Sequence, residues 1–202
     1  TTRIPMRSIS LQGLSEMLDD LPAAVDLLMA SRPSLIAVPI MSGSCLRGEA
    51  IANLLEQRSG VPVLTSAQET LRIFQRLKLR RAALVSPFGV EINLVEKIFF
   101  SKAGIEISPF ISTNENLEGD PYLVDAVDEA HILQSLRQAD LAATHAMLFH
   151  CPAHDIEPFV GELAEWYPKP VFSNTEVMMY RVLERLGLST QALPLHRVLH
   201  GR

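Results

Sequence analysis

Six short apolar runs alternate with longer amphipathic stretches along this chain of 202 residues, and this alternation restricts the fold more than any other feature. Each run is rich in Val, Ile, Leu or Phe and lacks the strict apolar–polar alternation of a half-exposed strand. Such runs are typical of parallel strands that are buried on both faces. We expect strands within residues 34–40, 62–65, 82–87, 105–111, 146–150 and 170–173.

The stretches between the runs place their apolar residues at helical spacing. We expect helices over residues 10–30, 45–58, 66–78, 89–103, 128–139, 155–166 and 174–187. The polar segment 112–122 is expected to be a loop. Because strands that alternate with helices form βαβ units, the sequence predicts an α/β fold with parallel sheets flanked by helices.

Two segments of the chain, 62–79 and 170–188, resemble each other. Both begin with Pro-Val and two further residues of a strand, and both end in Arg, two apolar residues, a polar residue and Arg-Leu-x-Leu. This internal repeat predicts two pseudo-symmetric halves, residues 1–66 plus 174–202 and residues 67–173. A chance likeness between two βαβ units is the alternative. The chain starts at Thr1 without a strand–helix unit, so we expect an N-terminal strand to be missing.

Composition excludes several classes of function. The net charge is −5 and the basic residues are scattered, which argues against a nucleic-acid partner. No apolar run reaches the roughly 18 residues that span a bilayer, so no membrane partner is expected. The two cysteines, Cys45 and Cys151, lie in different contexts, as in a reduced cytoplasmic protein. A homo-oligomer is left open.

Small polar residues follow nearly every predicted strand. In open α/β sheets, ligands bind beyond the carboxyl ends of the strands, and the helix starts there favour anions. Any one of these residues could simply cap its helix. Together they predict a cleft that binds an anion, most simply a carboxylate. The residues concerned are Ser42, Gly43, Ser44, Thr65, Ser66, Ser86, Pro87, Phe88, Cys151, Pro152, Ser173 and Asn174.

The stretch HAMLFHCPAHD, residues 145–155, contains the most reactive candidate. Cys151 ends a predicted strand just before a helix, where a thiol has a lowered pKa and is accessible. Pro152 suits the first turn of that helix. Cys45 follows Ser-Gly-Ser on a helix and is expected to be packing.

The same stretch also offers zinc ligands, namely His150, Cys151, His154 and Asp155. However, adjacent residues of a strand point to opposite sides, and no second Cys/His pair has a recognised spacing. We therefore expect no metal and interpret the histidines as incidental. The exception is His154, for which a role as partner of the thiol is left open. No dinucleotide-binding, Walker or Gly-x-Ser-x-Gly motif is present. What remains is cofactor-free proton chemistry beside a carboxylate, with a cysteine as acid, base or nucleophile.

The order and spacing of these motifs resemble the aspartate/glutamate racemase superfamily. The similarity is greatest to the branch of maleate cis–trans isomerases and arylmalonate decarboxylases. It extends over nearly the whole chain. The segments that carry it are SGSCLRG (42–48), PVLTSAQETL (62–71), RRAALVSPFGVEIN (80–93) and LFHCPAHDIEPFVGELAEWYPKPVFSN (148–174).

The resemblance implies two α/β halves with a carboxylate substrate between them and one cysteine at a strand end in each half. The second-half cysteine falls on Cys151. The place of the first is taken by Ile40 and Met41, and Phe88 stands where this branch often has a tyrosine. One thiol cannot act on both faces of a carbon, so a two-cysteine racemase is not expected.

The sequence therefore predicts a cofactor-independent isomerase or decarboxylase of a small carboxylic or dicarboxylic acid. Cys151 is the predicted catalytic residue, as proton donor or nucleophile. Ile40, Met41 and Phe88 would form an apolar wall, which suits loss of a carboxylate. The remaining strand-end residues would bind the substrate. The alternative is a degenerate protein of the same fold that binds a carboxylate without converting it.

Overall fold

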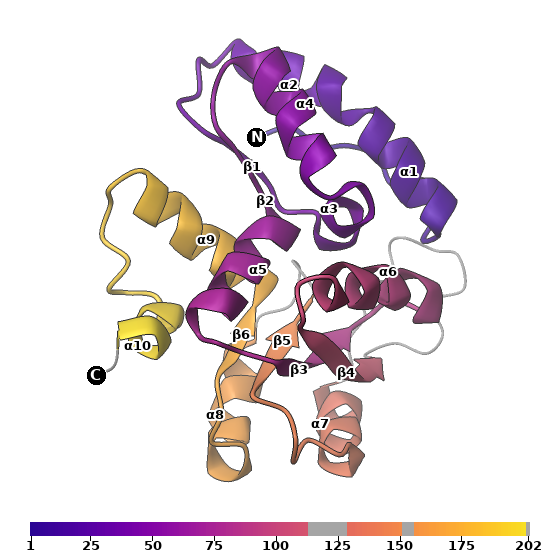
Figure 1. The fold of residues 1–202 in the computed structure, drawn as a ribbon, viewed down its shortest axis with the longest axis vertical. Helices are drawn as coiled ribbons and strands as arrows, with labels where there is room; N and C mark the ends of the chain where they lie inside the picture. The colour runs from indigo at the N-terminus through magenta and orange to yellow at the C-terminus, as the bar shows by residue number, and fades with distance from the viewer. Residues whose placement is uncertain (113–128, 151–155, 201–202) are drawn as a thin grey trace.

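The computed structural model describes residues 1–112, 129–150 and 156–200. Within these ranges, six strands form two sheets, and every described strand pair is parallel. This arrangement confirms the predicted α/β fold with parallel sheets (Figure 1). The smaller sheet consists of β1 (Ile36–Val38) and β2 (Val63–Thr65). The larger sheet has the order β4 (Glu106–Ser112), β3 (Arg81–Ser86), β5 (Ala146–Phe149) and β6 (Val171–Ser173).

The helices cover both sheets, and most agree with the expected ranges. They are α1 (Leu11–Asp19), α2 (Leu21–Met29), α3 (Met41–Arg47), α4 (Glu49–Ser59), α5 (Ser66–Arg76), α6 (Val90–Ser101), α7 (Glu129–Gln138), α8 (Glu157–Trp166), α9 (Asn174–Arg185) and α10 (Pro194–His200). No helix in these ranges is long and apolar enough to cross a membrane. The sequence did not predict α10.

Two expected helices are wrong in their limits. The helix expected over 10–30 is two helices, because Pro22 lacks the N–H that would continue α1 and instead occupies the first turn of α2. The helix expected over 45–58 starts earlier, at Met41, and is interrupted at Gly48, whose φ of 57° is outside the helical region. Cys45 therefore lies inside α3 rather than at the start of α4.

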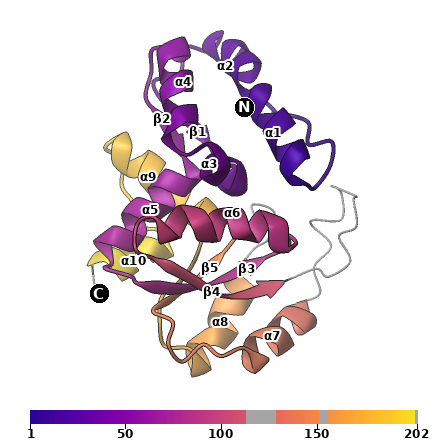
Figure 2. The same ribbon diagram turned by 45° about the vertical axis from the view of Figure 1, so that its right-hand side comes forward.

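The larger sheet is buried on both faces, as its apolar runs predicted. Alternate residues of β3 face opposite sides, so Ala82 and Leu84 pack in one apolar cluster while Ala83 and Val85 pack in another. The first cluster includes residues of α5, α6 and α9, and the second includes residues of α7 and α8. Figure 2 shows α6 on one side of the sheet and α7 and α8 on the other.

The repeated segments form equivalent units, β2–α5 and β6–α9, and the two helices pack against each other. At this contact, Glu69 of α5 is fully buried and forms ion pairs with Arg72 and with Arg181 of α9. The repeat therefore places the starts of two helices side by side at the carboxyl ends of strands from different sheets. The division into halves at residues 66 and 173 stays a prediction.

Candidate active site

Three segments meet at a buried carboxylate, that of Glu96 in α6. Glu96 is fully buried, and its Oε1 accepts a hydrogen bond of 2.6 Å from the hydroxyl of Ser42 in α3. Nδ1 of His150, the residue after β5, lies 2.7 Å from the same oxygen. This second contact is close but not aligned as a hydrogen bond. The other carboxylate oxygen, Oε2, has no hydrogen-bond partner among the described residues.

The sequence analysis missed Glu96 and did not anticipate the contacts of His150, which it interpreted as incidental. His150 is buried, and its ring centre lies 5.1 Å from that of Phe88 in addition to the contact with Glu96. A signal for Glu96 was present in the sequence. Glu96 lies between Ile92 and Phe100 at helical spacing, and both of these apolar residues are buried. An acid on the core-facing side of a helix indicates a specific partner or a functional role.

The turn between β3 and α6 fixes Phe88. The hydroxyl of Ser86 accepts a hydrogen bond of 3.1 Å from the Phe88 N–H, and the side-chain amide of Asn93 donates to the Phe88 carbonyl at 2.8 Å. The phenyl ring is buried in a cluster with Leu14 and Ile92. Phe88 can therefore supply an apolar surface beside His150 but no hydroxyl for an oxyanion.

Ser44 is already bonded within the protein. Its hydroxyl lies 2.6 Å from the carbonyl of Ile40 and 2.9 Å from that of Met41, and can donate to either. Its oxygen also accepts a hydrogen bond of 3.0 Å from the N–H of Ala67. Because Ala67 lies in the first turn of α5, Ser44 caps a helix that belongs to another segment of the chain. Ser44 thus joins α3 to α5.

A second group of predicted residues lies where α5 and α9 begin. The side-chain amide of Asn174 donates to the hydroxyl of Ser66 at 3.4 Å, and this hydroxyl lies 3.9 Å from the sulfur of Met41. Thr65 donates to the side chain of Gln68. The amide oxygen of Asn174 has no partner in the part of the chain that the structure describes, so it can accept a further hydrogen bond.

Ser173 caps the helix that it directly precedes, whereas Ser44 caps a helix of another segment. The hydroxyl of Ser173 accepts from the N–H of Glu176 at 3.0 Å, which caps α9. At the starts of α3, α5 and α6, the residues before the helix are Ile40, Thr65 and Gly89, and none of them caps its own helix with a side chain. Capping alone therefore does not account for the polar residues at these strand ends.

Of the two cysteines, Cys45 is the one that the structure describes, and it has the packing role that the sequence suggested. Cys45 is buried in the apolar core, and burial together with the nearby charge of Glu96 raises the pKa of its thiol well above the usual range. It is a packing residue. Cys151 and Pro152 lie outside the described residues, as do His154 and Asp155 of the zinc alternative. The described ranges contain no group of three His, Cys, Asp or Glu side chains that could hold a metal ion.

Residues Ile40 and Met41 stand at the start of α3, next to Ser42. Met41 is almost fully buried and Ile40 half-buried. Both contribute apolar side chains where the resemblance implied a cysteine. Whether they line a substrate pocket stays a prediction.

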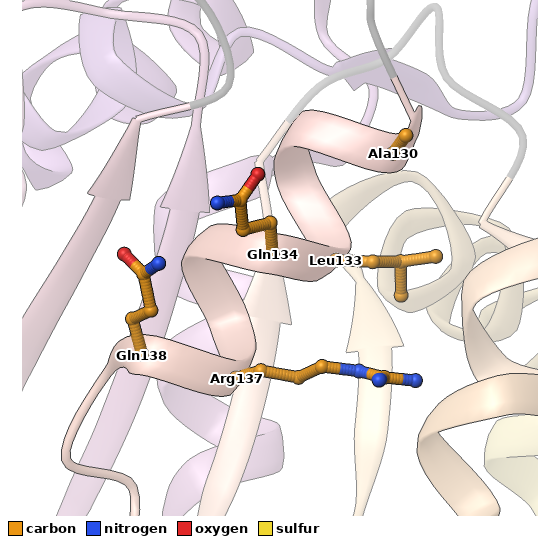
Figure 3. A pocket seen from close by; sticks show the side chains of 5 residues that line it. All are labelled: Ala130, Leu133, Gln134, Arg137 and Gln138. Atoms are coloured by element: carbon orange, nitrogen blue, oxygen red, sulfur yellow. The ribbon is translucent and has the colours of Figure 1, made fainter.

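A surface hollow lies elsewhere, along α7. Its lining residues all belong to this one helix, namely Ala130, Leu133, Gln134, Arg137 and Gln138 (Figure 3). Arg137 is ion-paired with Glu162 of α8. None of the predicted strand-end residues that the structure describes lines the hollow, so we assign it to the outer helical layer and not to the candidate site.

Comparison with known protein families agrees with this arrangement. The family model described as arylmalonate decarboxylase matches residues 2–199. The chain belongs to the arylmalonate decarboxylase family. Maleate isomerase from Geobacillus stearothermophilus is 23% identical over 156 residues, which are 75% of this chain and 60% of the isomerase. The chain thus spans less than two thirds of that relative.

Solved structures of the arylmalonate decarboxylase family and of maleate isomerases share the fold. A maleate isomerase variant from Pseudomonas putida S16 with maleate has a TM-score of 0.85 at 18% identity, over 96% of this chain and 80% of the isomerase. A mutant of the Nocardia farcinica maleate cis–trans isomerase with a covalently bound succinylcysteine intermediate has a TM-score of 0.82 at 20% identity, over 96% and 81%. A liganded arylmalonate decarboxylase mutant has a TM-score of 0.78 at 16% identity, over 90% and 78%.

Proposed function

We propose that this chain is a cofactor-independent enzyme that isomerises or decarboxylates a small carboxylic or dicarboxylic acid through the single thiol of Cys151. The observation that carries the proposal is the position of Cys151 in a family of such enzymes. In the sequence Cys151 follows His150, and His150 is the residue after β5 that contacts Glu96 and Phe88. A relative of the same fold holds a covalently bound succinylcysteine intermediate, which supports a cysteine as the reacting group.

The remaining thiol does not offer a second acid or base. Cys45 is buried in the core, and its thiol stays protonated because its pKa is raised well above the usual range. Racemisation needs groups on both faces of the reacting carbon, so the proposal is limited to chemistry that needs one thiol. Cys151 would either donate a proton to an enediolate after loss of carbon dioxide or add to a double bond that then rotates.

The predicted carboxylate-binding residues are those that follow the strands of the two sheets. Ser42 and Asn174 are the strongest of these, since both are buried and Asn174 keeps an unpaired amide oxygen. Ser66 joins them through its hydrogen bond with Asn174. The apolar side chains of Ile40, Met41 and Phe88 favour decarboxylation, because a leaving carboxylate is destabilised when water is excluded from it.

The second candidate is a protein that binds a carboxylate without converting it. Two observations favour it: no cysteine stands at Ile40 or Met41, and Phe88 offers no hydroxyl to an oxyanion. The acidic chain with two thiols also fits a cytoplasmic protein with a small-molecule partner, and a homo-oligomer is compatible with either candidate.

Thiol reactivity and turnover test the proposal together. Iodoacetamide is titrated against the protein across pH with and without maleate or phenylmalonate, and the modified cysteine is identified by mass spectrometry. We expect Cys151 to react as a thiol with a pKa below the usual value of about 8.5, and either ligand to protect it. Turnover of at least one ligand should be lost in Cys151→Ala and retained in the matched variant Cys45→Ala. An ordinary thiol without ligand protection, or turnover that persists in Cys151→Ala, contradicts the proposal; protection without turnover favours the binding protein.

A further inference from the structure

The hydroxyl of Ser42 has one proton, and in the free protein this proton is used within the protein. It is donated to Oε1 of Glu96 at 2.6 Å, and both side chains are buried. Ser42 is also one of the residues expected to bind a carboxylate, which requires the same proton. The two roles cannot be filled at once while Glu96 is a carboxylate.

The short distance between Ser42 and Glu96 would also bring two negative charges, those of the ligand and of Glu96, close together. A ligand oxygen that accepts from Ser42 would lie within hydrogen-bond distance of its Oγ, which is itself 2.6 Å from Glu96. The ligand carboxylate and the Glu96 carboxylate would then share one buried hydroxyl. Two carboxylates that close do not both stay ionised in a buried site, and one of them takes up a proton.

We propose that a carboxylate binds at Ser42 only together with one proton, which is taken up by Glu96. The inference rests on the proposed function, since it assumes that Ser42 belongs to the carboxylate site. The proton comes from solvent and forms the carboxylic acid of Glu96. That acid donates its O–H to Oγ of Ser42, and the hydroxyl of Ser42 turns its own proton to the ligand. The one carboxylate group bound at Ser42 and the proton on Glu96 together add no net charge at this position.

The groups around Glu96 fit this role. Among the described residues, Nδ1 of His150 lies 2.7 Å from Oε1 of Glu96, and no lysine or arginine of these ranges forms an ion pair with Glu96. From α3, the titratable group in electrostatic contact is Cys45, whose thiol is neutral, together with the hydroxyl of Ser42. Asn93, one turn earlier in α6, is buried and uncharged. The added proton lies on Oε1, the oxygen 2.6 Å from Oγ of Ser42, while Oε2 has no hydrogen-bond partner within the described ranges.

Glu96 is thus a positioning residue that acts through Ser42. A residue that only stabilises the fold would not change the number of protons taken up with the ligand or the pH dependence of binding. The proposal predicts that Glu96 determines both. Substituting Gln for Glu96 keeps the size of the side chain and imitates the protonated acid permanently. Substituting Ala for Ser42 removes the hydroxyl that connects Glu96 to the ligand.

Isothermal titration calorimetry of the whole chain with maleate and with phenylmalonate tests the proposal. Each titration is repeated in buffers of different ionisation enthalpy, which gives the number of protons taken up. We expect about one proton per ligand, and an affinity that falls about tenfold for each pH unit on the alkaline side. In Glu96→Gln the uptake should fall to zero and the affinity should become independent of pH. His150→Gln is the matched variant and should retain the uptake.

Each other outcome overturns the inference. Binding to the wild-type protein without proton uptake shows that Glu96 does not take the proton, while the proposed function stands. Uptake that persists in Glu96→Gln, or that disappears in His150→Gln alone, assigns the proton to another group. If neither ligand binds, the proposed function fails together with the inference. Should Glu96→Gln fail to fold, Ser42→Ala decides instead, and it is expected to lose both affinity and proton uptake.

Discussion

Oε1 of Glu96 lies 2.7 Å from Nδ1 of His150, and the two side chains are buried between α6 and the end of β5. A buried acid is costly unless it is paired, and keeping one in a core is common at functional sites. Here Ser42 donates a hydrogen bond to Glu96, and His150 is the residue before Cys151 in the chain. The polar centre of the candidate site is therefore a carboxylate, and it would repel the carboxylate of the proposed ligand.

Cys45 should be inert in the folded protein. Burial and the charge of Glu96 raise the pKa of its thiol, so the thiolate that reacts with iodoacetamide is scarce at neutral pH. We expect mass spectrometry to find Cys45 unmodified under native conditions after a reaction time that modifies Cys151 completely.

The unfolded chain provides the control. In urea both thiols should react at similar rates, since burial no longer separates them. If Cys45 of the folded protein reacted as fast as Cys151, its placement in the core would be contradicted. Protection by a ligand could then not be assigned to Cys151 alone.

The contact between α5 and α9 predicts an unequal effect of two arginines. Glu69 is fully buried and pairs with both, but the side chain of Arg181 is 21% exposed and that of Arg72 is 54% exposed. We expect Arg181→Ala to lower the free energy of unfolding by about 2 to 3 kcal/mol, because it weakens the pairing of a buried charge. Arg72→Ala should cost less than about 1 kcal/mol, as for an exposed ion pair.

Urea denaturation of the two variants measures the difference. A third variant, with both arginines replaced, should lose more than the sum of the two, because Glu69 then loses both of these ion-pair partners while it stays buried. Equal effects of the two single substitutions would mean that exposure does not govern this contact.

Gly43 in the Ser-Gly-Ser segment is required by close packing. A Cβ at this position would lie 2.9 Å from Cγ2 of Ile40 and 3.0 Å from Cδ2 of Leu18. We expect Gly43→Ala to lower the free energy of unfolding by about 1 kcal/mol, since overpacking outweighs the gain in helix propensity. Thermal unfolding of the variant measures this change.

Gly161 is the matched control, because it also lies inside a helix but a Cβ added there would meet no described atom within 4 Å. Gly161→Ala should raise the stability by about 0.5 to 1 kcal/mol through helix propensity alone. The same sign for both substitutions would show that the contacts of Gly43 with α1 do not restrict this position.

The strands were predictable because burial on both faces leaves a local trace in the sequence. The runs that became β3 and β5 are almost entirely apolar between their ends, and the structure buries their residues on both sides. Helix limits were less predictable. Pro22 and Gly48 end helical segments through backbone effects that the apolar periodicity does not record.

The sequence predicted candidate residues for the site but not their contacts. The strand-end rule identified Ser42, Ser66 and Asn174, and the structure brings Ser66 and Asn174 together. It could not identify Glu96, whose partner Ser42 is 54 positions away in the chain. Such a pair depends on how α3 and α6 pack, which no local pattern specifies. The role of Cys151 stays a prediction.

The link between α9 and α10 predicts how stability depends on pH. The carboxylate of Glu176 in α9 accepts a hydrogen bond from the N–H of Leu195 in α10. Burial raises the pKa of Glu176 above its usual range, although backbone hydrogen bonds with Leu195 and Ser173 oppose the shift. A raised pKa in the folded state means that folding favours the protonated acid. Its stabilising contribution is therefore complete below the unfolded pKa, near about 4.3, and is lost as the pH rises through the higher folded value.

Glu176→Gln removes this titration and retains a carbonyl oxygen for the N–H of Leu195. We expect the variant and the wild-type protein to differ least in stability near about pH 4, where Glu176 is largely protonated in both states. As the pH rises above that range, the free energy of unfolding of the variant should increase relative to that of the wild-type protein, and the difference should then become constant. Urea denaturation at a series of pH values measures it, with Glu184→Gln as a control on the same helix. A difference that is constant across pH, or that shrinks as the pH rises, would show that Glu176 is not held toward its protonated form.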